Sequence, residues 1–260
     1  MKTVSRVKVG TFDVEVWEEG TGPPLVFLHG YERHPGGAAF LARLAEHRHV
    51  WAPEQPGYGT SLGFDQVDDL MDLVLFYREL VMSFEAGAVD VIGHSTGGMI
   101  AAELSVIAPA LVRRLVLVDP FGLWIDDDPA QDPFGARDVV LAAKWHDPAL
   151  RPIPEPTNFV PDSDEPFAAS LFQARNYATA TKFMWPIAER GLRRRLQYLR
   201  APTLVVHGAA DGLLPVSYAR EMVRLIPDAR LELIEQAGHY PMLEQEDAFV
   251  ATVEAFLEEG

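Results

Sequence analysis

One serine flanked by glycines is the group in this sequence best suited to covalent chemistry. Ser95 lies in the segment 93–98 (Gly-His-Ser-Thr-Gly-Gly), directly after the apolar run 89–92 and directly before the helix-forming stretch 99–104. A strand, a tight turn and a helix in this order expose the serine hydroxyl at a helix N-terminus, where backbone N–H groups favour negative charge. The alternative is an ordinary glycine-rich turn, but this setting favours Ser95 as a nucleophile.

A serine hydroxyl is too weakly acidic to react alone, so a base is needed, together with an acid that orients the base. His239 follows the last predicted strand and precedes the last predicted helix, which places it at the carboxyl edge of a sheet, where such sites assemble. Two aspartates, Asp119 and Asp211, follow predicted strands. We favour Asp211 as the acid, because one helix and one strand fit between it and His239. Asp119 is the alternative, although its place before Pro120 also suits a turn.

The elements that would position these side chains alternate between strand and helix. Two alternating runs, at 4–9 and 12–17, predict an antiparallel hairpin. The short apolar runs that follow predict buried strands of a mostly parallel open sheet, at 25–29, 50–52, 89–92, 115–118, 204–207 and 231–234. Helix-period stretches between them predict helices on both faces, at 38–46, 67–84, 98–107, 216–225 and 248–257.

One interval interrupts this alternation, because about eighty residues separate the strand that ends at Val118 from the next one, far more than a usual connection. This interval holds half of the chain's 20 prolines and many aromatic side chains. Since linkers are poor in large apolar residues, we predict a helical cap over 121–186 and a core formed by 1–120 and 187–260. Some aromatic side chains must form the cap's own core, but those expected to line a substrate pocket are Trp145, Phe172, Tyr177, Trp185 and, beside His239, Tyr240.

The composition narrows the possible partners. A formal net charge of -16 argues against nucleic acid or anionic lipid, because no basic field offsets the repulsion. The chain has no cysteine, which excludes disulfides, thiolate metal sites and a cysteine nucleophile. We find no signal-peptide core and no apolar stretch of membrane length. We therefore expect a cytoplasmic protein with a small-molecule substrate and no membrane partner; the oligomeric state is not predicted.

Taken together, the motifs resemble those of the α/β-hydrolase superfamily, in its esterase and C–C hydrolase branch. The resemblance rests on His29-Gly30, the segment 57–61 (Gly-Tyr-Gly-Thr-Ser), the segment around Ser95, the segment 207–215 with Asp211, and Gly238-His239. It covers nearly all of the chain outside the predicted cap. The resemblance implies the α/β-hydrolase fold with an inserted helical cap.

The same resemblance implies an oxyanion hole formed by the backbone N–H groups of Tyr31 and Thr96, and it implies no metal and no cofactor. Two departures are visible. Glu54 stands where the family often has aspartate, which we expect to alter only a structural contact. The loop 29–36 lacks the glycine-rich run of typical meta-cleavage C–C hydrolases, which favours an esterase over a C–C hydrolase.

The expected activity is that of a carboxylesterase acting on small to medium apolar esters through Ser95, His239 and Asp211. The alternative within the fold is hydrolysis of a C–C bond next to a ketone. An alternative of another class is a ligand-binding or receptor protein that retains the triad with little turnover. Glu32, Arg33 and His34 lie beside the predicted oxyanion loop and could contact substrate, although such loops are usually solvated. The arginine run 193–195 is expected to form a solvated helix face.

Overall fold

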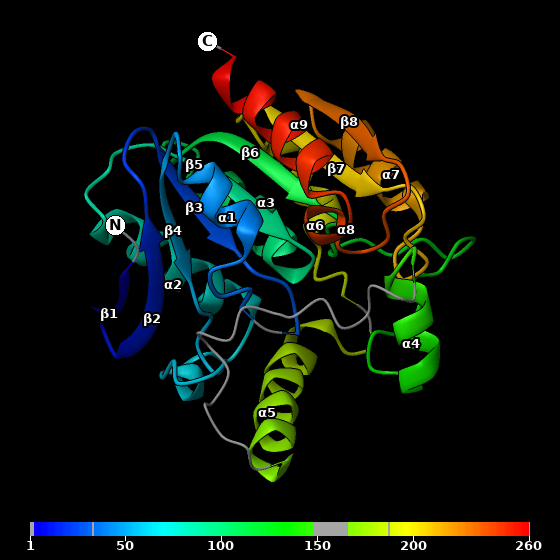
Figure 1. The fold of residues 1–260 in the computed structure, drawn as a ribbon, viewed down its shortest axis with the longest axis horizontal. Helices are drawn as coiled ribbons and strands as arrows, with labels where there is room; N and C mark the ends of the chain where they lie inside the picture. Colours follow the sequence, from blue (N-terminus) through cyan, green and yellow to red (C-terminus); the bar gives the residue numbers. More distant parts are fainter. Residues whose placement is uncertain (1–2, 33, 148–165, 187, 260) are drawn as a thin grey trace.

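The strand-like runs of the sequence form one sheet (Figure 1). The computed structural model describes residues 3–32, 34–147, 166–186 and 188–259. Within these residues the sheet has eight strands in the order β1-β2-β4-β3-β5-β6-β7-β8. Their bounds are β1 (Thr3–Val9), β2 (Phe12–Glu19), β3 (Pro24–Leu28), β4 (His49–Pro53), β5 (Val89–His94), β6 (Val112–Val118), β7 (Thr203–Gly208) and β8 (Ala229–Ile234).

The strand directions follow the hydrophobic pattern. β1 and β2 form the predicted antiparallel hairpin, and β2 is also antiparallel to β4. All other neighbouring strands are parallel. The central strands β5 and β7 are buried along their whole length, which explains why their sequences are apolar without alternation. The predicted hairpin and the mostly parallel sheet are therefore confirmed.

Helices cover both faces of the sheet and close two separate apolar cores. On one face, α1 (Ala39–Leu44) lies beside α9 (Glu246–Glu258) (Figure 1), where the rings of Phe40 and Phe249 are 5.9 Å apart. The other face is covered by α2 (Leu70–Ser83), α3 (Thr96–Ile107) and α7 (Val216–Leu225). The shorter helices are the 3-10 turns η1 (Phe64–Gln66) and η4 (Leu196–Tyr198), and α6 (Leu192–Arg195) and α8 (Pro241–Glu244).

One predicted boundary was wrong for a local reason. The helix expected over 67–84 begins only at Leu70, because the side chain of Asp69 accepts hydrogen bonds from the backbone N–H groups of Met71 and Asp72. Asp72 accepts in turn from the N–H of Asp69, which completes a capping box. Asp69 thus fixes the helix start, and Val67 stays outside it.

The arginine run was also interpreted wrongly as a solvated face. Arg193 pairs with Glu189 and Glu221, and Arg195 pairs with the fully buried Glu103 of α3. These carboxylates hold two of the three guanidinium groups against the sheet-covering helices, so the run anchors the end of the long insertion to the core.

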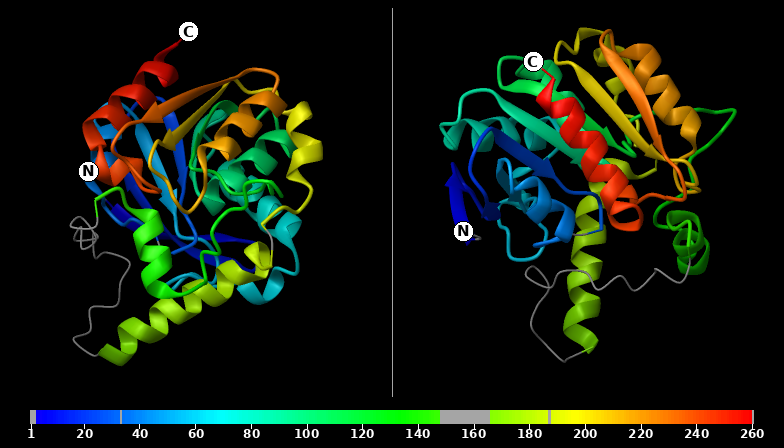
Figure 2. Two further views of the ribbon diagram at one scale, coloured as in Figure 1. Left: turned by 90° about the vertical axis from the view of Figure 1, so that its right-hand side faces the viewer. Right: turned by 45° about the horizontal axis from the view of Figure 1, so that its top comes forward.

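Two further helices, α4 (Arg137–Lys144) and α5 (Pro166–Met184), belong to the predicted cap 121–186. They lie apart from the helices that cover the sheet, and α5 extends away from it (Figures 1 and 2). Residues 148–165 of the predicted cap lie outside the described part of the chain, and the division into cap and core stays a prediction. No helix among the described residues is long and apolar enough to cross a membrane.

Glu54, the departure noted in the sequence, lies at the end of β4 with 1% of its surface exposed. Its carboxyl group accepts a hydrogen bond of 3.0 Å from the hydroxyl of Ser61. A Cβ on Gly59, whose φ is +46°, would collide with the same carboxyl group. Burial raises the pKa of Glu54 to about 7. Glu54 therefore ties the end of β4 to the turn 57–61, as expected for a structural contact.

This burial predicts a pH-dependent stability. The folded protein binds the Glu54 proton more tightly than the unfolded chain does, so its stability falls as the pH rises from 4.5 to about 7. Glu54→Gln should remove that loss. Its free energy of unfolding should exceed that of the wild type by about 1–3 kcal/mol at pH 8, but not at pH 4. Urea unfolding at both pH values measures this, with the exposed Glu46→Gln as control. If the difference in unfolding free energy between Glu54→Gln and the wild type does not grow with pH, the prediction is wrong.

Candidate active site

Ser95 lies at the junction of β5 and α3 in a strained backbone conformation, with φ of 59° and ψ of -117°. A non-glycine residue rarely adopts a positive φ, and such residues concentrate at functional sites. The strain is held from the neighbouring strand, because the N–H of Ser95 donates a hydrogen bond of 2.8 Å to the carbonyl of Val118. The serine hydroxyl is thereby fixed at the N-terminus of α3, as the sequence predicts.

The glycines around Ser95 permit this turn. A Cβ on Gly97 would collide with the carbonyl of Leu28, and a Cβ on Gly93 would collide with the carbonyl of Gly97. The loop after β3 also approaches closely, since a Cβ on Gly30 would lie 3.0 Å from the Cβ of Ser95. The glycines therefore let strand, helix and loop pack directly against the serine.

A hydrogen-bond chain joins the three predicted triad residues. His239 Nε2 lies 3.0 Å from Ser95 Oγ, and His239 Nδ1 lies 2.7 Å from Asp211 Oδ2. The carboxylate accepts from Nδ1–H, so Nε2 carries the lone pair that faces the serine hydroxyl. Ser95 and His239 are fully buried and Asp211 is 6% exposed. The arrangement is that of a base, oriented by an acid, next to a nucleophile.

Asp211 is held ionised by its surroundings. Burial opposes its ionisation, but the nearby His239 and His207 and the backbone N–H of Leu214 outweigh burial and lower its pKa below the ordinary value. Its Oδ1 accepts hydrogen bonds from the backbone N–H groups of Leu213 and Leu214, at 2.8 and 3.0 Å. The acid is therefore charged at neutral pH and fixed in orientation.

Asp119, the alternative acid, is buried at the end of β6. Its Oδ1 accepts a hydrogen bond of 2.9 Å from the N–H of Gly208 and makes none with His239. The structure thus brings Asp211, and not Asp119, into hydrogen-bond contact with His239.

Two further histidines beside the site are neutral. His29 accepts a hydrogen bond from the N–H of Gln55 and donates one to the carbonyl of Gly30; burial lowers its pKa to about 4. His94 donates to the carbonyl of His239, and burial lowers its pKa to about 3. Both rings bond the backbone of the loops around the site.

The predicted oxyanion donors flank the nucleophile. Thr96 is the first residue of α3, and the N–H of that position has no intrahelical acceptor. Tyr31 follows Gly30, which packs against Ser95. Among the described residues neither N–H has an acceptor, so both are free to donate.

A half-buried polar cluster lies beside the oxyanion loop, and it shows that Glu32 is paired rather than simply solvated. Its carboxylate is paired with Lys144 at the end of α4 and accepts hydrogen bonds from the hydroxyls of Tyr177 and Tyr240. Burial opposes ionisation of Glu32, but Lys144 and the two hydroxyls lower its pKa below the ordinary value. We call these four residues the Glu32 cluster. It links the loop after β3 to both predicted cap helices.

The predicted pocket residues are therefore divided. The hydroxyls of Tyr177 and Tyr240 bind Glu32, and the ring of Trp145 stacks on Tyr240 at 4.9 Å. Phe172 is half-buried on α5. Trp185 is 56% exposed and lines an apolar cavity. That these side chains line a substrate pocket stays a prediction.

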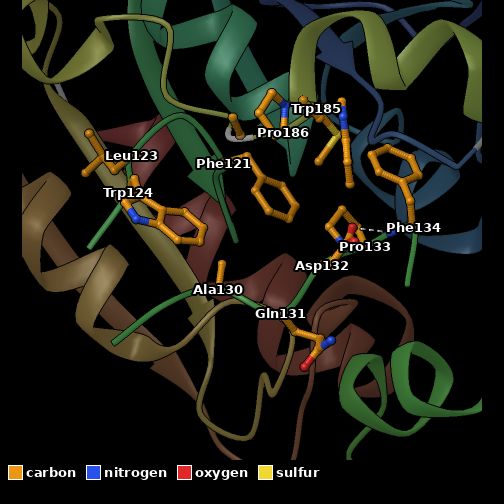
Figure 3. A pocket seen from close by; sticks show the side chains of 12 residues that line it. Phe121, Leu123, Trp124, Ala130, Gln131, Asp132, Pro133, Phe134, Trp185 and Pro186 are labelled. Carbon is orange, nitrogen blue, oxygen red and sulfur yellow. Dashed lines mark hydrogen bonds between the residues drawn. The ribbon is translucent and has the colours of Figure 1, made fainter. Parts of the chain in front are cut away.

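That cavity has a volume of about 180 Å³, and Figure 3 shows the side chains that line it. The ring of Phe121, one of its walls, is 5.7 Å from the ring of His239, and the N–H of Phe121 donates to the carbonyl of Ser95. In Figure 3 the Phe121 ring lies between Trp124 and Phe134. The other lining residues are Leu123, Ala130, Gln131, Asp132, Pro133, Met184, Trp185, Pro186 and Ala188.

Lys144 has no counterpart in the predictions from sequence. Its partner Glu32 is 112 positions away in the sequence. Because only folding brings the two residues together, no local sequence pattern predicts the pair. Asn176 of α5, which donates to the backbone carbonyl of Glu32, was missed for the same reason.

Comparison with known proteins identifies the class. The sequence model of the alpha/beta hydrolase family matches residues 25–252, so the chain belongs to this family. The predicted α/β-hydrolase fold is confirmed. A membrane phospholipase A described as a bacterial virulence factor has the same fold, with a TM-score of 0.81, 23% identity, and coverage of 99% of this chain and 86% of that one.

Three relatives with similar sequences are named for three different proteins. The chain is 31% identical, over 94% of its length, to polyketide synthase ThaQ of Burkholderia thailandensis, but spans only 12% of that protein. It is 26% identical to a 2-hydroxy-6-oxo-6-(2'-aminophenyl)hexa-2,4-dienoic acid hydrolase of Metapseudomonas resinovorans, covering 96% of this chain and 89% of the relative. It is 27% identical to a pimeloyl-[acyl-carrier protein] methyl ester esterase of Nitrosomonas europaea, covering 93% and 98%.

The Glu32 cluster predicts strong coupling between two distant residues. Glu32→Leu leaves Lys144, whose side chain is 3% exposed, as a buried unpaired cation and should destabilise the fold by about 3 kcal/mol. Adding Lys144→Met should restore at least about 1 kcal/mol, because the charge is then gone. Denaturant unfolding of Glu32→Leu, Lys144→Met and the double variant measures the coupling. If the losses of unfolding free energy in the two single variants simply add in the double variant, Glu32 and Lys144 are not coupled.

Proposed function

We propose that the protein is a carboxylesterase that hydrolyses small to medium, uncharged apolar esters through a serine triad. The observation that carries the proposal is the hydrogen-bond chain from Ser95 Oγ through His239 to Asp211, at 3.0 and 2.7 Å. Membership of the alpha/beta hydrolase family supports it.

In the proposed reaction Ser95 Oγ attacks the ester carbonyl carbon while His239 Nε2 takes the hydroxyl proton. Asp211 stabilises the imidazolium and keeps Nδ1 protonated. Collapse of the tetrahedral intermediate breaks the C–O bond, and His239 returns the proton to the leaving alcohol. Water, deprotonated by the same nitrogen, then attacks the acyl-enzyme and releases the acid. His239 thus acts as a base and as an acid in each half-reaction.

The negative charge of each intermediate forms on the former carbonyl oxygen. The N–H groups of Tyr31 and Thr96 are the proposed donors to that oxygen, each worth roughly 3 kcal/mol of barrier. The close approach of Gly30 to Ser95 supports this role, because it brings the Tyr31 loop against the nucleophile.

The surroundings favour an uncharged substrate. Lys144, the cation that α4 brings to this side of the site, is neutralised by Glu32, and the net charge of -16 repels anions. The apolar cavity beside Phe121 is about 180 Å³, the size that suits a short acyl chain or a single ring. An ester with such an acyl group is therefore the preferred substrate class.

C–C bond hydrolysis is the second candidate, because one relative is named as a dienoic acid hydrolase. The substrate of that relative is a carboxylic acid. Because Lys144 is already paired with Glu32, it does not offer a free positive charge to such a carboxylate. A ligand-binding protein with an idle triad is the alternative outside enzymes.

A panel of p-nitrophenyl esters tests the proposal. The wild type should hydrolyse short neutral acyl esters, Ser95→Ala should abolish turnover, and Asp211→Asn should lower kcat on the order of 10⁴-fold. A dienone carboxylate assayed alongside measures C–C cleavage.

Turnover of the dienone with none of the esters would replace the esterase by the C–C hydrolase. Turnover of neither substrate class by the folded wild type would favour the ligand-binding alternative. Arg220→Ala, an exposed change on α7, is the control and should behave as the wild type.

The cavity predicts acyl specificity. Ala130→Leu adds three carbons to its wall and should raise KM for a phenyl-bearing acyl ester by about tenfold, since lost apolar burial costs about 1–2 kcal/mol. KM for the acetyl ester should stay unchanged. Equal effects on both esters would place the acyl group outside this cavity.

A further inference from the structure

Asp119 lies behind the triad on a segment that is hydrogen-bonded to the nucleophile. It follows Val118, whose carbonyl accepts from the N–H of Ser95, and its own N–H donates 3.0 Å to the carbonyl of Val206 in β7. Its φ is +43°, a conformation that aspartate and asparagine tolerate better than most residues. The backbone is therefore bent to aim this carboxyl group between β6 and β7.

The contacts of the carboxyl group are incomplete. Oδ1 accepts from the N–H of Gly208, but Oδ2 is buried and has no hydrogen-bond partner among the described residues. Asp119, Asp211 and His239 each place one oxygen or nitrogen within 4.8 Å of the others. Two carboxyl groups thus face each other in a site closed to water.

His207 of β7 completes the group. Its Nε2 lies 2.8 Å from the carbonyl of Leu214, and only an N–H can bond a carbonyl, so Nε2 carries the hydrogen. Burial lowers the pKa of His207, which keeps the ring neutral. Its Nδ1 is then an acceptor, yet it lies 3.3 Å from Asp119 Oδ1 and has no donor among the described residues.

An ionised Asp119 would therefore face the lone pair of His207 Nδ1 with one oxygen, and it would also lie next to the carboxylate of Asp211. Burial and the charge of Asp211 both raise the pKa of Asp119, and the more distant Glu244 acts in the same direction. The opposing contact, the N–H of Gly208, is a single neutral donor. A proton on Asp119 Oδ2 removes the conflict with Asp211 and leaves Oδ1 to accept from the N–H of Gly208.

We propose that Asp119 is a positioning residue: it is protonated at neutral pH, and as a neutral acid it donates a hydrogen bond to Asp211. This contact keeps Asp211 aimed at His239, and the missing second charge lets His239 release its proton to the leaving group. The role in turnover rests on the proposed function, whereas the proton on Asp119 does not.

Infrared spectroscopy tests the proton directly. The carbonyl band of a protonated carboxyl group should be present at neutral pH in a Glu54→Gln background, which removes the other carboxyl that titrates near 7. Adding Asp119→Asn should remove one such band. A difference spectrum with no band lost would overturn the proposal, whether or not the protein hydrolyses esters.

Two substitutions test positioning. Asp119→Gly removes the carboxyl group without strain at φ +43° and should lower kcat roughly 10- to 100-fold with little change in KM. Asp119→Asn keeps a donor to Asp211 and an acceptor for Gly208, so it should rescue most of the rate. It should also leave the acid limb of the kcat/KM–pH profile in place.

An Asn variant as slow as the Gly variant, or one whose acid limb moves to lower pH, would mean that Asp119 is ionised and would overturn the proposal. Thermal melting checks that both variants fold. If the wild type hydrolyses no ester, the rate at which a fluorophosphonate labels Ser95 replaces kcat. Failure of the esterase and failure of the positioning role are then separate results.

Discussion

Asp211 accepts a hydrogen bond from the buried His239, and this contact requires the ends of three separate strands to lie close together. Ser95 follows β5, Asp211 follows β7, and His239 follows β8. Parallel strands bring their carboxyl ends to one edge of the sheet, so the parallel part of the sheet is what allows the three groups to meet.

The α4 helix contributes to the same geometry. The carbonyl of Lys144 accepts from the N–H of His239 at 2.7 Å, and the carbonyl of Ala143 accepts from the N–H of Gly212 at 2.9 Å. The end of α4 thus fixes the two loops that carry the base and the acid. Through Lys144 and Glu32 it also holds the loop after β3. A helix from the long insertion is therefore part of the framework of the candidate site.

Much of this follows from local sequence, and the rest does not. The turn around Ser95, the strand ends and the order of Asp211 and His239 are written in contiguous segments, so hydrophobic period and turn chemistry predict them. The partners of Glu32 depend on how α4 and α5 lie against the core, which no short segment encodes. The start of α2 depended on a single capping residue, Asp69.

The nucleophilic character of Ser95 is the central claim, and the intact mass of the protein after reaction with a fluorophosphonate tests it most directly. The account predicts one adduct per chain on the wild type and none on Ser95→Ala. A folded wild type that forms no adduct, or the same adduct on Ser95→Ala, would contradict it.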